Sequence, residues 1–163
     1  MKYILPLVSL TFIFLVEKYN EKLIPVARIT SNGFKISLDT IAYKKKIVDN
    51  FITNKDFFFE KTEIVKKKDK SIDHKEYYFI SVINKTKHVR ISRWLEKKGK
   101  KLYFVNTGDY KQTYLWCVGE NDCEPNLFKD MEEMSWACGE NPFCSNDTRI
   151  IRPCKVLKSM MQE

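Results

Sequence analysis

The chain has 163 residues, of which 44% are apolar and 13% aromatic, and it carries a formal net charge of +8. This length fits one domain with a single core, and the apolar content excludes an intrinsically disordered chain. A basic balance can indicate binding to nucleic acid, heparin-like polyanions or acidic membranes. The lysines, however, occur in runs beside or between the expected strands, as on solvated edges, so we expect no nucleic-acid partner.

Residues 1–18 have the pattern of a secretory signal peptide. Lys2 is followed by fourteen uncharged residues, Tyr3 to Val16, a run shorter than the ~20 apolar residues that a membrane-spanning helix needs. Leu15–Lys18 contains no small residues of the kind that precede a cleavage site. The cleavage position is therefore left open, with an uncleaved anchor as the alternative, and residues 19–163 are expected to form a single β-rich domain of a secreted, extracellular protein.

The first part of this domain alternates β-prone runs with turn residues. Val26–Thr30 and Phe34–Leu38 flank a glycine-containing turn and predict a hairpin. Ile41–Ile52 is ambiguous between a loop and a short helix, because Lys45 falls on its apolar stripe. Phe57–Val65 predicts a strand that begins in the core.

Four further strands are expected in succession. The first is apolar on both pleat faces, which suits a central strand covered on each side or one whose inner face lines a cavity. The last two flank Asn106–Asp109, whose residue types favour a turn and therefore a β-hairpin. The succession predicts an antiparallel meander that forms a barrel or a sandwich. The four strands are Glu76–Ile83, His88–Leu95, Leu102–Val105 and Tyr114–Val118.

The apolar spacing changes from period two to a helical period at Leu127. Met131 and Met134 share one helical face with Leu127, and charged residues occupy the other face. Gly139 is a residue type that ends helices. We therefore predict one C-terminal helix, followed by a tail whose last strand lies within Thr148–Leu157.

The cysteines all lie in the last third of the chain. Their gaps of five residues do not match the two to four residues between ligands of structural zinc sites, so we expect disulfides and no metal. An odd number leaves one thiol free or paired with a second chain as a dimer. The sequence does not fix the connectivity, although a bridge from Cys117 to the tail would hold the C-terminal segment against the sheet. The disulfide candidates are Cys117, Cys123, Cys138, Cys144 and Cys154.

Two triplets match the acceptor pattern for N-glycosylation, at Asn84 and Asn146. The two histidines, His74 and His88, are expected to be exposed, and the chain contains no phosphate-binding loop, no H-E-x-x-H helix and no G-x-S-x-G elbow. We therefore expect a protein that is not an enzyme and that carries no cofactor.

Leu102–Cys117 resembles the middle motif of the lipocalin (calycin) family, in which an aromatic-x-V-x-D-T-D-Y strand is followed by a second strand that ends near a cysteine. The residues that carry the resemblance are Val105, Thr107, Asp109, Tyr110, Tyr114 and Cys117. The resemblance implies a secreted carrier of a small hydrophobic molecule, bound in a cup lined by inward side chains.

Aromatic residues at alternate positions of the meander are the candidates for ligand contact, although the same spacing also fits plain core packing. The leading hypothesis is a secreted, lipocalin-like binder of a small hydrophobic ligand, and the alternative is a secreted, disulfide-stapled β-sandwich that recognises a receptor or host factor. A third hypothesis is a basic polyanion binder, which heparin retention with a steep salt dependence would support. A carrier requires a dry cavity of ~300 Å³ or more, whereas a recognition protein should have a filled interior and an exposed apolar patch. The candidate ligand contacts are Tyr78, Trp94, Tyr103, Tyr114 and Trp116.

Overall fold

The computed structural model describes residues 23–54, 56–68, 75–107, 109, 111–119, 123–130, 133–139 and 155–161. Within these residues the protein contains ten strands and one helix, which confirms the mainly β prediction. No helix in this part of the chain is long and apolar enough to span a membrane. The elements are β1 (Ile24–Thr30), β2 (Gly33–Ile36), α1 (Thr40–Phe51), β3 (Lys61–Lys68), β4 (Glu76–Asn84), β5 (Val89–Lys98), β6 (Lys101–Phe104), β7 (Tyr114–Val118), β8 (Pro125–Asp130), β9 (Glu133–Cys138) and β10 (Lys155–Ser159).

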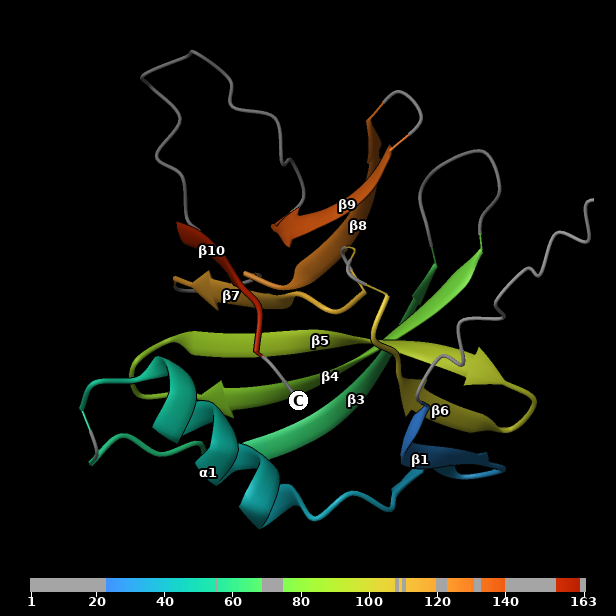
Figure 1. Cartoon of the computed structure of the whole chain (residues 1–163), viewed down its shortest axis with the longest axis horizontal. Coiled ribbons are helices and arrows are strands. Elements are labelled where there is room, and N and C mark those ends of the chain that lie inside the picture. Colours follow the sequence, from blue (N-terminus) through green and yellow to red (C-terminus); the bar gives the residue numbers. More distant parts are fainter. Residues whose placement is uncertain are drawn as a thin grey trace, which may run out of the picture.

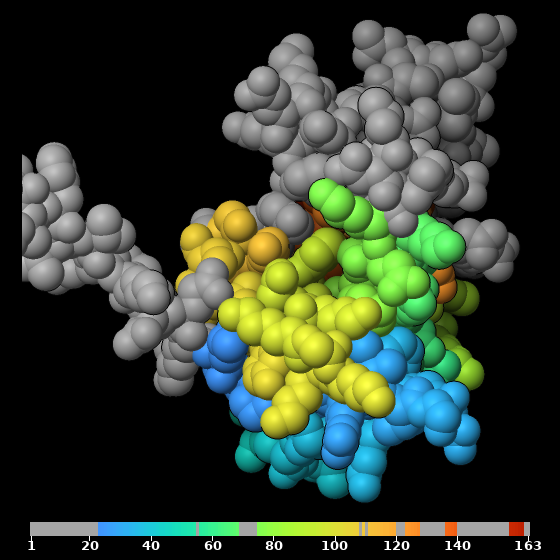
Figure 2. All heavy atoms as spheres, turned by 90° about the vertical axis from the view of Figure 1, so that its right-hand side faces the viewer, coloured from blue at the N-terminus to red at the C-terminus, as the bar shows by residue number. Residues whose placement is uncertain are grey.

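Eight of the strands form one antiparallel sheet that is nearly closed into a barrel (Figure 1). β5 is its central strand and pairs with β4, β6 and β7. β3 extends the sheet beyond β4, and β10 extends it beyond β7. β1 and β2 extend it beyond β6, so that these strands and the end of β5 share one face of the molecule, coloured blue and yellow in Figure 2.

The predicted hairpin at the end of the meander is not formed, although both of its strands are present as β6 and β7. β6 pairs with the last part of β5, at Glu96–Lys98, and with β1. β7 pairs with the first part of β5, at Val89–Arg93, and with β10. Nine residues separate the two strands, a connection too long for the tight turn that would hold them side by side.

The helix α1 covers the concave side of the sheet. Asp39 caps its N-terminus by accepting hydrogen bonds from the backbone nitrogens of Ile41 and Ala42, both at 3.0 Å. The buried stripe runs through Tyr43 and Ile47, whereas the stripe through Ile41 and Lys45 faces solvent. The lysine that made this segment ambiguous in sequence therefore lies on the exposed face. The side chains that share this first core include Val26, Tyr78, Ile80, Val82, Ile91, Leu95, Leu102, Phe104 and Tyr114.

A second core lies on the opposite face of the sheet, beneath a hairpin formed by β8 and β9 (Figure 1). Leu127 and Trp136 of this hairpin pack against Phe79, Trp94 and other sheet residues. β4 alternates its buried side chains between the two cores. The first interpretation of its sequence, a central strand covered on each side, is thus confirmed.

The predicted C-terminal helix is wrong, because this part of the chain forms β8 and β9. Leu127 and Trp136 are cross-strand partners, and both are buried while their neighbours Asn126 and Ala137 are only half-buried. This is the period of a strand. Burial of the tryptophan and the tie at Cys138 override the local helical pattern, as tertiary contacts commonly do.

Several sequence predictions fall on residues that the structure does not describe. They are the signal peptide at 1–18, His74, Tyr110, Met131, Cys144, Asn146, Cys154 and the first part of the predicted last strand. The described end of that strand forms β10.

Candidate functional site

The predicted ligand contacts do not form one group. Tyr78, Tyr114 and Trp116 lie on the concave face and belong to the first core. Trp94 lies in the second core, on the other side of the sheet, where its ring stacks on Tyr77 at 5.6 Å. Tyr103 is half-buried and alternates with fully covered concave-face neighbours, so it points to the outer face. Three of the five residues therefore share a face.

The concave side, where a lipocalin-like cup would hold its ligand, is filled by α1. The Tyr43 ring packs on Phe104 with centroids 5.6 Å apart, and the Phe51 ring packs on Tyr114 at 5.2 Å and on Trp116 at 5.7 Å. The aromatic spacing that suggested ligand contacts is here the spacing of helix-to-sheet packing.

Arg93 of β5 is a fully buried charge that lies close to the two ends of the connection between β6 and β7. Its Nη1 donates to the Tyr114 hydroxyl at 3.2 Å, and its Nη2 donates to Asn106 Oδ1 at 3.0 Å. The guanidinium also lies 4.3 Å from the centre of the Phe104 ring. Arg93 thus fixes the connection between the two strands, and we assign it a structural role.

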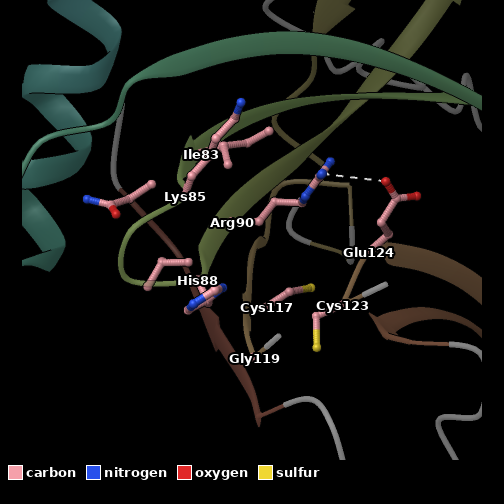
Figure 3. A pocket seen from close by; sticks show the side chains of 10 residues that line it. Ile83, Lys85, His88, Arg90, Cys117, Gly119, Cys123 and Glu124 are labelled. Carbon is pink, nitrogen blue, oxygen red and sulfur yellow. Dashed lines mark ion pairs between the residues drawn. The ribbon is translucent and has the colours of Figure 1, made fainter. Parts of the chain in front are cut away.

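A pocket of about 410 Å³, lined by both apolar and charged residues, lies at the end of the β4–β5 turn, beside the cysteines (Figure 3). Its lining includes His88, Arg90, Cys117, Cys123 and Glu124. His88 is exposed, as predicted, and adopts a φ of 51°, which is unusual for a residue other than glycine. Within the described parts of the chain, no three His, Cys, Asp or Glu side chains are grouped as a metal site would require.

Two charged residues of this pocket, Arg90 and Glu124, form ion pairs that hold the start of β8 to the sheet. Arg90 Nη1 lies 2.9 Å from Glu63 Oε1, and Arg90 Nη2 lies 3.5 Å from Glu124 Oε1. Lys67 Nζ lies 2.8 Å from Glu124 Oε2 and also donates to the Pro125 carbonyl at 3.1 Å. Partial burial alone would raise the pKa of Glu124, but the hydrogen bond from Lys67 and the charges of Lys67 and Arg90 outweigh it and hold that pKa below 4.5. We therefore assign the charged residues of this pocket a structural role.

The disulfide bond between Cys117 of β7 and Cys138 of β9 links the β8–β9 hairpin covalently to the sheet, with Cα atoms 5.4 Å apart. Cys123 is disulfide-bonded as well. The prediction of disulfides is confirmed at these residues. The bridge from Cys117 reaches the β8–β9 hairpin, which stands where a helix was expected.

Asn84, one of the two glycosylation candidates, is only 4% exposed. Its Nδ2, the atom that would carry a glycan, donates to the Phe58 carbonyl at 2.7 Å. Its Oδ1 accepts from the Lys87 backbone nitrogen, also at 2.7 Å. The amide is thus used at both ends to fix the segment that precedes β3.

An apolar groove of about 340 Å³ lies between α1 and the segment Phe57–Phe59. Its two most exposed apolar side chains are Ile41, 79% exposed, and Phe58, 62% exposed. The buried Val48 and Phe59 form part of its lining. Large apolar side chains that are exposed next to each other around a groove often mark a surface that binds another molecule.

The backbone beneath the Phe58 ring is held from two sides. Asn84 binds the Phe58 carbonyl from the sheet, and Lys44 Nζ of α1 donates to the Phe59 carbonyl at 3.0 Å. The Phe57 and Phe59 rings pack on each other at 5.1 Å. Phe58 is therefore an exposed ring on an anchored backbone.

This groove was not predicted from the sequence. The run of three phenylalanines was the available signal, since it is too apolar for a surface strand, but a strand interpretation hides the fact that the middle ring points outward. The contacts that fix the backbone of this segment come from residues 15 and 26 positions away in the chain.

Comparison of the chain with protein-family models, curated proteins and solved structures gave no match.

Proposed function

We propose that the protein acts by protein–protein recognition, as a disulfide-stapled extracellular module, and that the groove between α1 and Phe57–Phe59 receives a segment of the partner. The observation that carries this proposal is the exposed Phe58 ring on a backbone fixed by Asn84 and Lys44. The helix-filled concave side favours recognition over transport of a small ligand. The disulfides favour an oxidising compartment.

An anchored aromatic side chain is well suited to binding. A ring on a backbone that is already fixed loses less conformational entropy when a partner covers it than a ring on a free loop, so more of the contact energy appears as affinity. Aromatic residues in this position commonly contribute about 2 kcal/mol or more to an interface. Phe58 and Ile41 are therefore the expected anchors.

The groove also indicates the chemistry of the partner. Its apolar floor fits a protruding aliphatic or aromatic side chain. Lys45, exposed on α1 at the rim, would attract an acidic residue beside that side chain. Lys44 is already committed to the Phe59 carbonyl. We therefore expect a partner segment with one apolar anchor and an acidic neighbour.

Selection of short displayed peptides on the immobilised protein tests this assignment. Enriched peptides should pair an apolar anchor with an acidic residue, and Phe58→Ser or Ile41→Ser should weaken their binding by about tenfold or more. Leu157→Ser is the matched control, because Leu157 of β10 is 60% exposed and lies outside the groove. Equal loss of binding in the control and the groove variants would refute the assignment.

A small-ligand carrier is the second candidate, because a groove of about 340 Å³ is within the size range of ligand sites. Titration with a fluorescent fatty acid separates the two functions. A carrier would bind the fatty acid saturably at one site and lose it in Phe58→Ser, whereas a recognition module would bind the selected peptides and leave the fatty acid free.

A further inference from the structure

Four basic residues lie directly opposite one another across four neighbouring strands. Lys35 of β2 is the cross-strand partner of Arg28 of β1, which is also the partner of Lys101 of β6, which in turn faces Lys98 of β5. All four are exposed, on the face that the blue and yellow segments form in Figure 2. We call these four residues the basic row.

Folding alone gives little reason for such a row. Like charges directly opposite each other on neighbouring strands repel and weaken a sheet. Lysines do protect exposed sheet edges from aggregation, and Lys35 on β2 fits that role, but Arg28 and Lys101 lie on β1 and β6, each paired on both sides. Among the described residues, no ion pair involves Arg28, Lys35 or Lys101.

The acid nearest to the row in the strand register is already engaged. Glu96 of β5 stands two residues before Lys98, and its carboxylate lies 3.1 Å from Lys111 Nζ. Arg28, Lys35 and Lys101 therefore keep their positive charges available at the protein surface.

We propose that the basic row binds a linear sulfated polysaccharide. Neighbouring strands lie about 4.8 Å apart, so the row extends over roughly 14 Å with one cation at each step. A chain with repeated sulfate and carboxylate groups can contact successive cations of such a line, and the Arg28 guanidinium can hold one sulfate through two hydrogen bonds.

The surroundings of the row favour this class over other polyanions. The disulfide between Cys117 and Cys138 favours an extracellular setting, where sulfated polysaccharides are met. The next cross-strand row consists of Glu96, Tyr103 and Pro25. It offers an acid and a half-buried ring, whereas a membrane-binding face needs large apolar side chains to insert.

Binding of a heparin-derived oligosaccharide, measured calorimetrically on the full folded chain at physiological salt, tests the proposal. Arg28→Glu with Lys101→Glu should weaken binding by about tenfold or more and reduce its dependence on salt. Lys46→Glu with Lys87→Glu is the control, because it changes the net charge equally at two exposed lysines outside the row. This control should bind within about threefold of the parent.

The double variant replaces one like-charge pair by another, so a single variant serves as the folding check. Arg28→Glu alone converts two repulsive cross-strand pairs into attractive ones, so its thermal midpoint at low salt should rise above that of the parent while its affinity for the oligosaccharide falls. The proposal is overturned if both double variants lose equal affinity, if the parent does not bind the oligosaccharide, or if a single-stranded DNA of similar charge binds more tightly.

Discussion

Removal of the bond between Cys117 and Cys138 should destabilise the protein by about 3 kcal/mol. The two cysteines are separated by 21 residues in sequence, and closing a loop of this length removes roughly that much conformational free energy from the unfolded chain. The change is best made as the double variant Cys117→Ala with Cys138→Ala, because a single substitution leaves a thiol able to attack the other disulfide of the chain. In a domain of this size, such a loss lowers the thermal midpoint by about 6–12 °C.

Urea unfolding followed by tryptophan fluorescence and by far-UV circular dichroism measures this loss. Trp136 of β9 is fully buried against the sheet next to Trp94, so two of the three tryptophans report on the packing of the hairpin, whereas circular dichroism reports on the whole sheet. The two transitions should coincide at a lower midpoint, and their slope should not decrease, because the unfolded chain without the bond exposes at least as much surface. A midpoint within 2 °C of the parent in a thermal scan, or a hairpin that unfolds separately, would refute the loop-closure reasoning.

Three further changes test the interactions that position the candidate site. Arg93→Met should destabilise the fold by roughly 1–3 kcal/mol, measured by urea unfolding, because it leaves buried acceptors without their donor. Glu124→Gln should flatten the loss of stability in acid, measured as the thermal midpoint against pH. The lowered pKa means that Glu124 stabilises the fold above pH 4.5 and that this contribution is lost as the pH falls through its folded-state pKa. Glycopeptide mass spectrometry of protein secreted from eukaryotic cells should find Asn84 unmodified, because its side-chain nitrogen is buried and hydrogen-bonded.

Each of these three expectations has a clear contrary outcome. If Arg93→Met unfolds with the same free energy as the parent, and Arg93→Lys is no more stable than Arg93→Met, the buried charge does not stabilise the connection between β6 and β7. An acid limb identical in the parent and in Glu124→Gln would place the relevant titration elsewhere. A glycan found on Asn84 would mean that the Phe58 carbonyl has another donor.

The positions of the strands were easier to predict from the sequence than the pairing of the strands in the sheet. β4 reads as apolar on both faces, and the two layers that cover it follow directly from that pattern. The strands β6 and β7 were found, but their pairing depends on Arg93, whose hydrogen bonds lie 12 to 21 residues away in the chain. A local turn signal carries no information about such a contact.

For the segment around Leu127, the type of secondary structure was itself predicted wrongly. Its residue spacing fits a helix, yet the segment forms two strands that bring Trp136 and the Cys138 bridge to the sheet. The candidate groove likewise could not be predicted from the local sequence, because the backbone that carries the Phe58 ring is held by the distant residues Asn84 and Lys44. The local sequence pattern predicted the secondary structure of most segments, and contacts with residues distant in the chain explain the segments for which the prediction failed.

The double cover of β4 also bears on how the protein can be produced. Its run from Tyr77 to Ile83 is aromatic, β-branched and uncharged, which is the composition of segments that stack into amyloid-like zippers. In the native molecule the neighbouring strands and both layers shield this run. The hairpin that forms one layer is held by a bond that a reducing cytosol would not form. Expression there should yield insoluble material, and export to an oxidising compartment should yield soluble protein.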